Sequence, residues 1–398
     1  MIATQGTRTR TAAPVTRPGR RWHVCIVTET YAPEVNGVAR TLGHLVSGLR
    51  ARGHLVSIVR PRQGGVDTPS GAPDPALTLV SGLPLPGYGA LRFGLPAGAR
   101  LQKRWSSHRP DVVYVATEGP LGWSAVGAAR RLGITVLGGF HTNFPSYAPH
   151  YRAGWLRRGI LHYLKGFHNG TDGTLVPTAE LRDQLRWAGF RNLTVLGRGV
   201  DGRLFTPARR SAALRKAWNA SESDLVILYV GRIAPEKNVD LVVRAYRAVR
   251  RTSEAVRLVV VGDGPSRRAL HDALPEASCP GVLVGEALAE HYASADVFLF
   301  PSETETFGNV ILEAMASGLV VLAYDYAAAR AHIEPGRSGV LVPHRDARAF
   351  VEAAMALARS PDRRLAMRER VRETVAHLHW DHVVTRFETW LTEAITHD

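Results

Sequence analysis

The 398-residue chain contains only two cysteines and no long uninterrupted hydrophobic run. Cys25 lies within an apolar segment and Cys279 precedes a proline, and neither has a metal-binding spacing to histidine. The sequence therefore indicates neither a zinc site nor a disulfide framework. No stretch approaches the roughly 18 apolar residues that suggest a membrane-spanning helix. We expect a cytoplasmic protein.

Acidic residues are scarce in the N-terminal half. Residues 1–21 carry five arginines and no acid, and residues 22–200 carry twenty basic against nine acidic side chains. The formal net charge of +15 therefore originates before residue 201. This asymmetry is typical of proteins that meet a polyanion, either nucleic acid or an anionic membrane surface. A general aid to solubility is the alternative.

Length and periodicity indicate two α/β domains. A chain of 398 residues is too long for one ordinary core. From His23 onward, short apolar runs alternate with helical patterns, which is typical of parallel sheets covered on both faces. The first candidate strands are 23–30, 55–60, 77–80, 111–117, 134–140, 173–177 and 193–196. The second set is 225–230, 256–261, 282–284, 296–300, 320–323 and 340–342, and residues 61–98 are expected to be mostly loop.

These patterns divide the chain into four segments. Residues 1–21, rich in Thr, Arg and Pro, are interpreted as a disordered basic tail. Residues 22–202 and 203–379 each predict a doubly wound parallel-sheet domain, with the joint at 201–207. Residues 380–398 carry apolar residues at helical spacing, and we expect this helix to pack back on the first domain.

One glycine-rich turn gives a misleading match. Residues 197–202 read Gly-Arg-Gly-Val-Asp-Gly, which satisfies the dinucleotide pattern G-x-G-x-x-G after a strand-like segment. A dinucleotide site requires a long apolar helix to begin there, whereas the chain continues as Arg-Leu-Phe-Thr-Pro. The match is therefore interpreted as coincidental.

Two cations follow the candidate strand 225–230. Arg232 and Lys237 lie on one strand-to-helix loop, at the sheet edge where open α/β folds bind ligands. Arginine presents a planar fork and lysine a point charge to phosphate oxygens. Alone, such a pair is usually solvated. Beside a second phosphate-facing element it predicts a pyrophosphate clamp.

Segment 300–318 supplies that second element. It reads Phe-Pro-Ser-Glu-Thr-Glu-Thr-Phe-Gly-Asn-Val-Ile-Leu-Glu-Ala-Met-Ala-Ser-Gly, and its Gly-Asn opens a helix whose free N–H groups suit a phosphate. Glu305 and Glu313 lie around this helix start, about 12 Å apart if fully helical. A ligand with hydroxyls at both ends and a pyrophosphate between them fits, which describes a nucleotide sugar. The alternative is a surface turn with solvated glutamates.

Gly231-Arg232, Lys237 and the segment from Glu305 to Gly318 resemble the retaining glycosyltransferases of family 4, which have the GT-B fold. The resemblance covers nearly all of residues 22–398. Residues 31–38, Tyr-Ala-Pro-Glu-Val-Asn-Gly-Val, are similar to the first loop of the family, and 140–142, Phe-His-Thr, to its sugar-facing histidine. The blocks 141–151 and 167–172 are similar to bacterial mannosyltransferases and sulfoquinovosyltransferases that build glycolipids.

The resemblance implies an N-terminal acceptor-binding domain and a C-terminal nucleotide-sugar-binding domain. It implies that Glu313 holds the ribose hydroxyls, that Glu305 holds the donor sugar, and that Arg232 and Lys237 neutralise the leaving diphosphate. His141 would touch the sugar near its anomeric centre, and a strand-end histidine satisfied by backbone is the alternative. The further donor-binding candidates are Gly37 and the backbone around Phe307, Gly308, Asn309 and Val310. Asn36 stands where the family often has another glycine.

The implied reaction is hexosyl transfer with retention of configuration, in which the protein stabilises the departing nucleoside diphosphate electrostatically. No Asp-x-Asp metal motif is present, so we expect neither a metal nor another cofactor. The two glutamates are expected to bind the donor rather than to act as an acid/base pair.

A basic amphipathic helix is predicted over residues 152–167. Its apolar residues at helical spacing are Trp155, Leu156, Ile160, Tyr163, Leu164 and Phe167, and its flanking cations are Arg152, Arg157, Arg158 and Lys165. Such a face suits an anionic bilayer and the acceptor side of the enzyme. The alternative is that the stripe packs on the core of the first domain.

We therefore predict a glycosyltransferase that moves a hexose, with mannose from GDP-mannose as first choice, to a lipid-linked or glycolipid acceptor on the inner face of the cytoplasmic membrane. Transfer of glucose or sulfoquinovose from a UDP-sugar to a diacylglycerol-type lipid is one alternative. A GT-B sugar-nucleotide epimerase is another, although Glu305 and the basic helix favour transfer. A nucleic-acid-binding protein is the third, and the chain lacks a recognition motif for that role.

Overall fold

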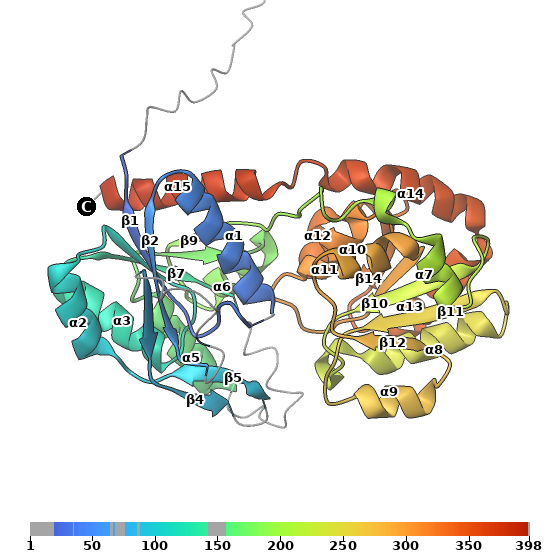
Figure 1. The fold of residues 1–398 in the computed structure, drawn as a ribbon, viewed down its shortest axis with the longest axis horizontal. Coiled ribbons are helices and arrows are strands. Elements are labelled where there is room, and N and C mark those ends of the chain that lie inside the picture. Colours follow the sequence, from blue (N-terminus) through green and yellow to red (C-terminus); the bar gives the residue numbers. More distant parts are fainter. Residues whose placement is uncertain are drawn as a thin grey trace, which may run out of the picture.

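The computed structural model describes residues 20–34, 36–63, 67, 76–85, 88–141 and 157–396. It contains two α/β units that lie side by side (Figure 1). The chain completes the first unit, crosses to the second, and returns to the first at its C-terminal end. The predicted fold class, two doubly wound parallel sheets with a returning C-terminal helix, is confirmed.

The N-terminal sheet has the strand order β3-β2-β1-β6-β7-β8-β9, and all its neighbouring strands are parallel. Its order reverses between β1 and β6, which creates a switch point at the carboxyl ends of these two strands. The strands are β1 His23–Val27, β2 Leu55–Pro61, β3 Leu77–Val80, β6 Val112–Val115, β7 Thr135–Gly139, β8 Gly173–Val176 and β9 Leu193–Val195.

The C-terminal sheet has the order β12-β11-β10-β13-β14-β15, again with parallel neighbours. Its switch point lies between β10 and β13. The strands are β10 Leu225–Val230, β11 Val256–Val261, β12 Ser278–Gly281, β13 Val297–Phe300, β14 Val320–Tyr324 and β15 Gly339–Val342.

Both sheets are covered on both faces, which explains their continuous apolar strands. In β1, Val24 and Ile26 join one core cluster, while Cys25 and Val27 join the cluster on the opposite face. The covering helices of the first unit are α1 Gly37–Ala51, α2 Gly98–Ser107, α3 Pro120–Arg131, α5 Arg157–His168 and α6 Ala179–Trp187. Those of the second unit are α7 Ala212–Ala217, α8 Val239–Arg250, α9 Arg267–Ala273, α10 Gly285–Ser294, α11 Asn309–Ala316, α12 Ala327–His332, α13 Ala347–Arg359 and α14 Pro361–Val375.

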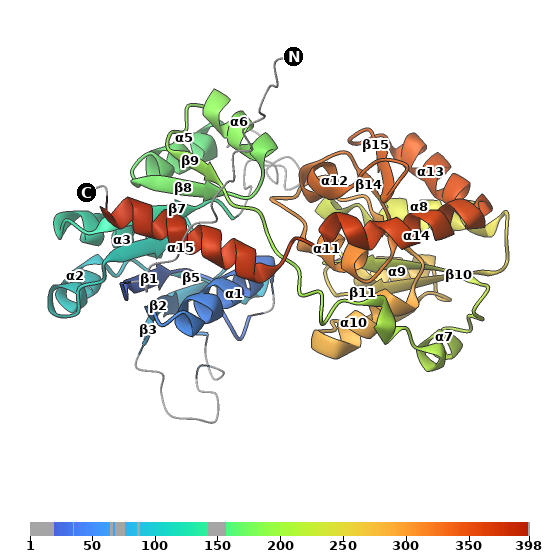
Figure 2. The same cartoon turned by 90° about the horizontal axis from the view of Figure 1, so that it is seen from above.

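The chain passes between the two units twice, and the two crossing segments lie side by side. Val200 forms an isolated parallel bridge with His379, and a Cβ at Gly199 would lie 2.7 Å from the backbone nitrogen of Trp380. The last helix, α15 Trp380–Thr396, then runs across the first unit (Figure 2). Its Val384 and Phe387 are buried in the core cluster that includes α1.

Two local expectations were wrong. The strand predicted at 282–284 is absent, because the edge strand β12 ends at Gly281 and leaves Val282 61% and Val284 56% exposed. The segment 61–98, expected to be mostly loop, contains the antiparallel hairpin of β4 Gly82–Leu85 and β5 Tyr88–Gly94. A Cβ at Gly82 would lie 2.7 Å from Pro61, so this position of β4 requires a glycine. Because glycine is also typical of loops, the sequence did not indicate a strand here.

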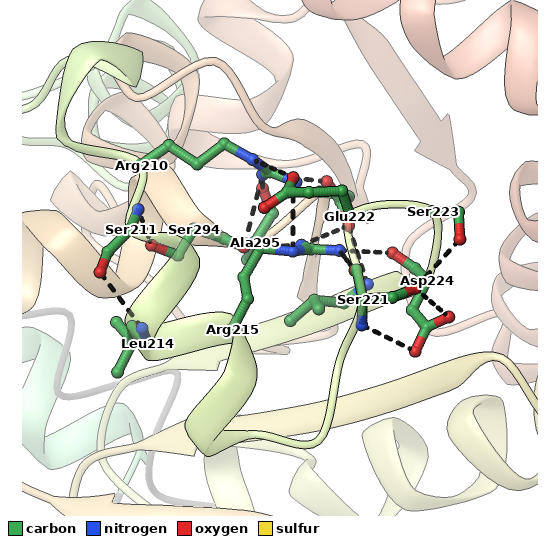
Figure 3. Close-up of polar contacts among 12 residues, drawn as sticks. Arg210, Ser211, Leu214, Arg215, Ser221, Glu222, Ser223, Asp224, Ser294 and Ala295 are labelled. Carbon is green, nitrogen blue, oxygen red and sulfur yellow. Dashed lines mark hydrogen bonds and ion pairs between the residues drawn. The ribbon is translucent and has the colours of Figure 1, made fainter.

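A buried arginine network fixes the start of β13. Arg215 on α7 is 1% exposed and donates to the backbone oxygen of Ser294 at 2.9 Å and to Asp296 Oδ2 at 3.2 Å (Figure 3). It also donates to the backbone oxygen of Asp224 at 2.7 Å. Asp296 directly precedes β13, whose far end carries the segment 300–308. The network therefore anchors one end of the strand that positions Glu305.

Candidate active site

A cleft of about 1670 Å³ is lined by both units. In the first unit its walls include the loops after β1 and β6, and in the second unit the loops after β10 and β13. These strand pairs are the switch points of the two sheets, so both ligand-binding edges border the same space. The volume exceeds the range of about 300–1000 Å³ that suits one small ligand, so the cleft can hold two substrates together.

The sequence-selected residues meet in this cleft. Its lining includes Gly37, His141, Arg232, Lys237, Glu305, Phe307, Gly308, Asn309, Val310 and Glu313. They come from segments up to 276 positions apart, from Gly37 to Glu313, and only the fold brings them together.

Glu313 lies on α11 and is held from two directions. Its Oε1 forms an ion pair with Arg40 Nη2 of α1 at 2.9 Å, and its Oε2 accepts a hydrogen bond from the Tyr292 hydroxyl at 3.2 Å. Burial raises the pKa of the Glu313 carboxyl, and the Arg40 charge opposes that rise. Because Arg40 belongs to the first unit, this ion pair bridges the cleft.

The two cations after β10, Arg232 and Lys237, each contact a carboxylate. Lys237 forms an ion pair with Glu305, and Arg232 Nη1 lies 3.3 Å from Oε1 of the buried Glu236. The backbone oxygen of Glu305 accepts a hydrogen bond from the Tyr326 hydroxyl at 2.9 Å. These contacts hold both cations and Glu305 in place on the wall of the cleft.

The helix start at α11 has the backbone geometry that a phosphate site needs. Gly308 has a φ of +99°, a left-handed conformation that favours glycine, and α11 begins at the next residue. Gly37 of the first unit faces this start, since a Cβ there would lie 3.7 Å from Asn309 Nδ2. The N–H groups at Gly308–Val310 thus lie at a helix start, where backbone donors can bind an anion.

Asn36 has a structural role in the first loop. Its Oδ1 accepts hydrogen bonds from the backbone N–H groups of Val38 at 3.1 Å and Ala39 at 2.9 Å, so it is the N-cap of α1. The Asn36 side chain therefore occupies the N-terminal N–H groups of α1.

His141 follows β7 and is bonded through both ring nitrogens. Nδ1 lies 2.8 Å from Arg198 Nη2, and Nε2 lies 2.8 Å from the Tyr114 hydroxyl. Arginine can only donate, so Nδ1 is the acceptor and the proton of the neutral ring lies on Nε2. Burial, with the Arg198 and His168 charges, lowers the pKa of His141 well below 6.5. The ring is therefore neutral, and neither nitrogen is free for a sugar hydroxyl.

A second acidic group lies on the wall of the first unit. Glu118 is buried, and its Oε1 lies 3.2 Å from His168 Nε2. Glu29, two residues after the end of β1, has an Oε1 with no hydrogen-bond partner among the described residues. Burial chiefly, with Glu118 as a further cause, raises the pKa of Glu29 to about 7. A Cβ at Gly119 would lie 2.0 Å from Glu29 Oε1, so a larger residue at this position would require the carboxylate to move.

The predicted acceptor helix is described only from Arg157 as α5; Arg152 and Trp155 lie outside the described residues. Leu164 and Phe167 are buried, and Ile160 packs against the same core cluster as Leu164. The expectation that this part of the apolar stripe faces a bilayer is therefore wrong, because it covers the sheet of the first unit. Arg158 remains exposed and Lys165 is half-buried.

Several site residues were not found from the sequence. Arg40 and Tyr292 reach Glu313 from α1 and α10, and no local motif marks them. Arg198 lies within the glycine-rich turn 197–202. Once the dinucleotide match of this turn is set aside, a single arginine in it does not indicate a site. Val282, misread as a strand residue, lines the cleft instead.

Among the described residues, no cluster of metal-ligating side chains is present. Within the same part of the chain, no helix is long and apolar enough to cross a membrane.

Comparison with protein families gives two matches that follow the two units. The family described as "Glycosyltransferase Family 4" matches residues 35–203, and the family described as "Glycosyl transferases group 1" matches residues 224–360.

Curated relatives carry related names. A "GDP-mannose-dependent alpha-mannosyltransferase" of Mycobacterium tuberculosis is 36% identical over 328 residues, which cover 80% of this chain and 83% of that protein. A "Sulfoquinovosyl transferase" of Arabidopsis thaliana is 30% identical over 73% of this chain and 56% of its own length. An "Alpha-monoglucosyldiacylglycerol synthase" of Streptococcus pneumoniae is 27% identical over 75% of this chain and 70% of that protein.

Solved structures share the fold. Sucrose-phosphate synthase of Thermosynechococcus elongatus matches with a TM-score of 0.77 and 20% identity, over 95% of this chain and 100% of that one. HepE of Anabaena, in complex with UDP and glucose, matches with a TM-score of 0.75 and 17% identity, over 94% of this chain and 100% of that one.

Proposed function

Because this chain belongs to glycosyltransferase family 4 and is a hexosyltransferase, we propose that it transfers mannose from GDP-mannose to a lipid-linked or glycolipid acceptor at a membrane surface. The observation that carries the donor half is the set Arg232, Lys237, Glu305 and Glu313 around one helix start in a two-domain cleft. The lipid acceptor is supported by the relative named as an alpha-monoglucosyldiacylglycerol synthase.

In the proposed reaction the bond between the anomeric carbon and the diphosphate breaks, and a bond to an acceptor hydroxyl oxygen forms with retention of configuration. The acceptor proton passes to an oxygen of the leaving diphosphate. Arg232, Lys237 and the N–H groups at Gly308–Val310 stabilise the charge that develops there. Glu305 accepts hydrogen bonds from the sugar hydroxyls, and Glu313 from the ribose.

We propose that the reaction proceeds without a metal ion. Arg232, Lys237 and the N-terminal end of α11 provide the positive charge that a divalent ion supplies in other enzymes that act on nucleotides. Val282 and Leu283 form an apolar edge of the same cleft, which suits the face of a nucleotide base.

We propose that the C-terminal end of α6, rather than α5, contacts the membrane. Trp187 is 93% exposed, and Arg186 beside it is exposed too. α5 adjoins this end, since Asn169 Nδ2, just after α5, donates to the backbone oxygen of Gly189 at 3.0 Å. An exposed tryptophan among cations is typical of a protein that touches the headgroup region of an anionic bilayer on its cytoplasmic side.

The donor and acceptor are tested with the purified protein and a panel of nucleotide sugars, first alone and then with membrane lipids. GDP-mannose with lipid should give a mannosylated lipid with an α linkage, and EDTA should leave the rate unchanged. Transfer only from a UDP-sugar to diacylglycerol would replace the proposed donor. Conversion of the nucleotide sugar without lipid would favour an epimerase, and no reaction with any lipid would refute the acceptor class.

Membrane contact is tested by flotation with anionic and neutral vesicles. Trp187→Ala should weaken binding to anionic vesicles roughly fivefold or more, because it removes the exposed aromatic group. Leu365→Ala, which removes an exposed apolar side chain from α14, is the control and should bind as the parent protein does. Equal binding to neutral vesicles, or no effect of Trp187→Ala, would contradict the proposal.

A further inference from the structure

Arg198 is a buried cation on the wall of the cleft. It lies within the turn 197–202, just after β9, and is only 7% exposed. Nevertheless it lines the cleft together with His141. Burial lowers the pKa of its guanidinium to about 10, so the group still carries a full positive charge near neutral pH.

Within the described part of the chain, no carboxylate neutralises this charge. The hydrogen-bond partners of Arg198 there are the backbone oxygen of Leu196 at 3.3 Å and His141 Nδ1 at 2.8 Å, both neutral. Tyr114 opposes the fall in the pKa of Arg198. Its own hydroxyl is neutral near pH 7, because burial raises the pKa of Tyr114. The nearest undescribed segment in sequence, 142–156, contains no acidic residue.

Three other cations of the cleft are paired with carboxylates, whereas Arg92, a further cation of the lining, donates to the backbone oxygen of Arg62 at 3.2 Å. Arg40 contacts Glu313, Arg232 contacts Glu236, and Lys237 contacts Glu305. The equally buried Arg215, in the network of the second unit, contacts Asp296. Arg198 differs from these four in having no counter-ion among the described residues.

An uncompensated buried charge is costly, and proteins ordinarily pair such groups. A guanidinium also has five N–H donors, of which the described contacts use two. A group with several acceptor oxygens and a negative charge would satisfy both deficits at once.

We propose that Arg198 is an oxyanion site of the cleft, where a phosphate, carboxylate or sulfonate of a bound substrate supplies the missing counter-charge. The proposal rests on the proposed transfer function, because it takes its ligand from the two substrates of that reaction. The oxyanion comes either from the diphosphate of the donor or from an anionic headgroup of the acceptor lipid.

The contact with His141 offers a competing explanation, namely that Arg198 only fixes the tautomer of that ring. The two roles differ in the binding of anions. A positioning residue would change turnover and the titration of His141 but not the affinity for a diphosphate. An oxyanion site changes that affinity directly.

The binding test uses the full chain as Arg198→Met, which removes the charge, and Arg198→Lys, which keeps it without the fork. Calorimetry with GDP and with guanosine separates the phosphate from the base. If the donor supplies the oxyanion, Arg198→Met should weaken GDP about 10–100-fold and leave guanosine unchanged, and Arg198→Lys should recover part of the loss. Arg131→Met, an exposed arginine at the end of α3, is the matched control.

The acceptor source is tested by transfer to phosphatidylinositol, which is anionic, and to glucosyl-diacylglycerol, which is neutral. If the acceptor supplies the oxyanion, Arg198→Met should keep the parent affinity for GDP and lose about tenfold or more in kcat/KM for the anionic lipid relative to the neutral one. This ratio is internal to each variant, so a general loss of activity does not imitate it.

Stability gives a readout that needs no turnover. Because the charge lacks a counter-ion in the free protein, Arg198→Met should melt at a temperature equal to or above that of the parent. A clear fall in melting temperature, or unchanged GDP affinity together with an unchanged lipid ratio, would overturn the proposal. If the parent protein transfers no sugar to lipid but Arg198→Met still weakens GDP, the proposed function fails and the oxyanion site stands.

Discussion

Lys237 and Glu305 form an ion pair at the point where the donor sugar and the diphosphate would join. In the proposed function this glutamate has two roles: it orients Lys237, and it accepts hydrogen bonds from the donor sugar. An amide of the same size keeps the shape but removes the charge that holds Lys237. Glu303, two residues earlier, pairs with Arg345 instead and does not line the cleft.

Glu305→Gln should lower turnover about 100-fold or more, because charge stabilisation at the reacting centre is usually the largest catalytic contribution. Steady-state kinetics with the donor found in the panel measures this effect. Glu303→Gln is the matched control and should retain nearly normal turnover. Near-normal activity of Glu305→Gln would refute its role at the sugar.

Glu29 makes the stability of the first unit depend on pH. Its pKa is raised from 4.5 to about 7, chiefly by burial, so the folded protein holds a proton that the unfolded chain releases. Between pH 4.5 and 7 the folded state binds more protons than the unfolded state, and the unfolding free energy falls as the pH rises. The stabilisation is complete below pH 4.5 and lost above about pH 7.

The glutamine variant isolates this contribution, because an amide does not titrate. The unfolding free energy of the parent minus that of Glu29→Gln should decrease by about 3 kcal/mol between pH 4.5 and 7. Urea unfolding at a series of pH values measures the difference. A difference that stays constant, or that grows with pH, would show that Glu29 ionises normally.

Among the elements, α1 and α15 show how a distant helix completes a core. Val384 of α15 packs directly over Gly48 of α1, where a Cβ would lie 2.5 Å from Val384 Cγ2. Gly43, on the same helix, would place a Cβ in open space, with no other atom within 4 Å. Both positions are helical glycines in the sequence, and only the packing of α15 on Gly48 makes their environments differ.

Gly48→Ala should destabilise the protein by about 1–3 kcal/mol, since overpacking exceeds the helix propensity that alanine adds. Gly43→Ala should be neutral or up to about 1 kcal/mol more stable. Denaturant unfolding compares the two, and Val384→Ala combined with Gly48→Ala should recover part of the loss. Equal stability of the two alanine variants would mean that α15 does not press on α1.

At the scale of the whole molecule, ion pairs between described residues connect the two units. Arg40 of α1 reaches Glu313 of α11, and Glu180 of α6 contacts Arg330 of α12 at 2.7 Å. The first pair ends on a buried carboxylate, whereas the second lies between more exposed side chains. A buried partner loses more when its counter-charge is removed.

Arg40→Gln should therefore open the cleft in the absence of nucleotide, and small-angle scattering should report a larger radius of gyration. Arg330→Gln is the control, with a smaller change expected because a surface pair contributes little. Saturating GDP should bring Arg40→Gln back toward the parent value. A radius unaffected by Arg40→Gln would show that the closure does not depend on this pair.

Much of the architecture was predictable, because strands buried on both faces need continuous apolar runs and helices need periodic ones. The candidate donor residues were predictable for a related reason: each lies on the loop or helix that follows β1, β10 or β13, at the sheet edge where open α/β folds bind ligands. The edge strand near 282 was misplaced, since apolarity there serves a cleft wall rather than a sheet. The stripe of α5 was assigned to a bilayer because periodicity identifies an apolar face but not what covers it.

The sequence by itself determined the two α/β domains, the returning helix, and two local pairs, Arg232 with Lys237 and Glu305 with Glu313, because local patterns and short spacings encode these features. The tertiary structure decided which charges are paired. Arg40 meets Glu313 across 273 positions, and Arg198 is buried beside His141 with no counter-ion among the described residues. Electrostatic energy depends on distance and burial in space, and neither quantity is written in the order of the residues.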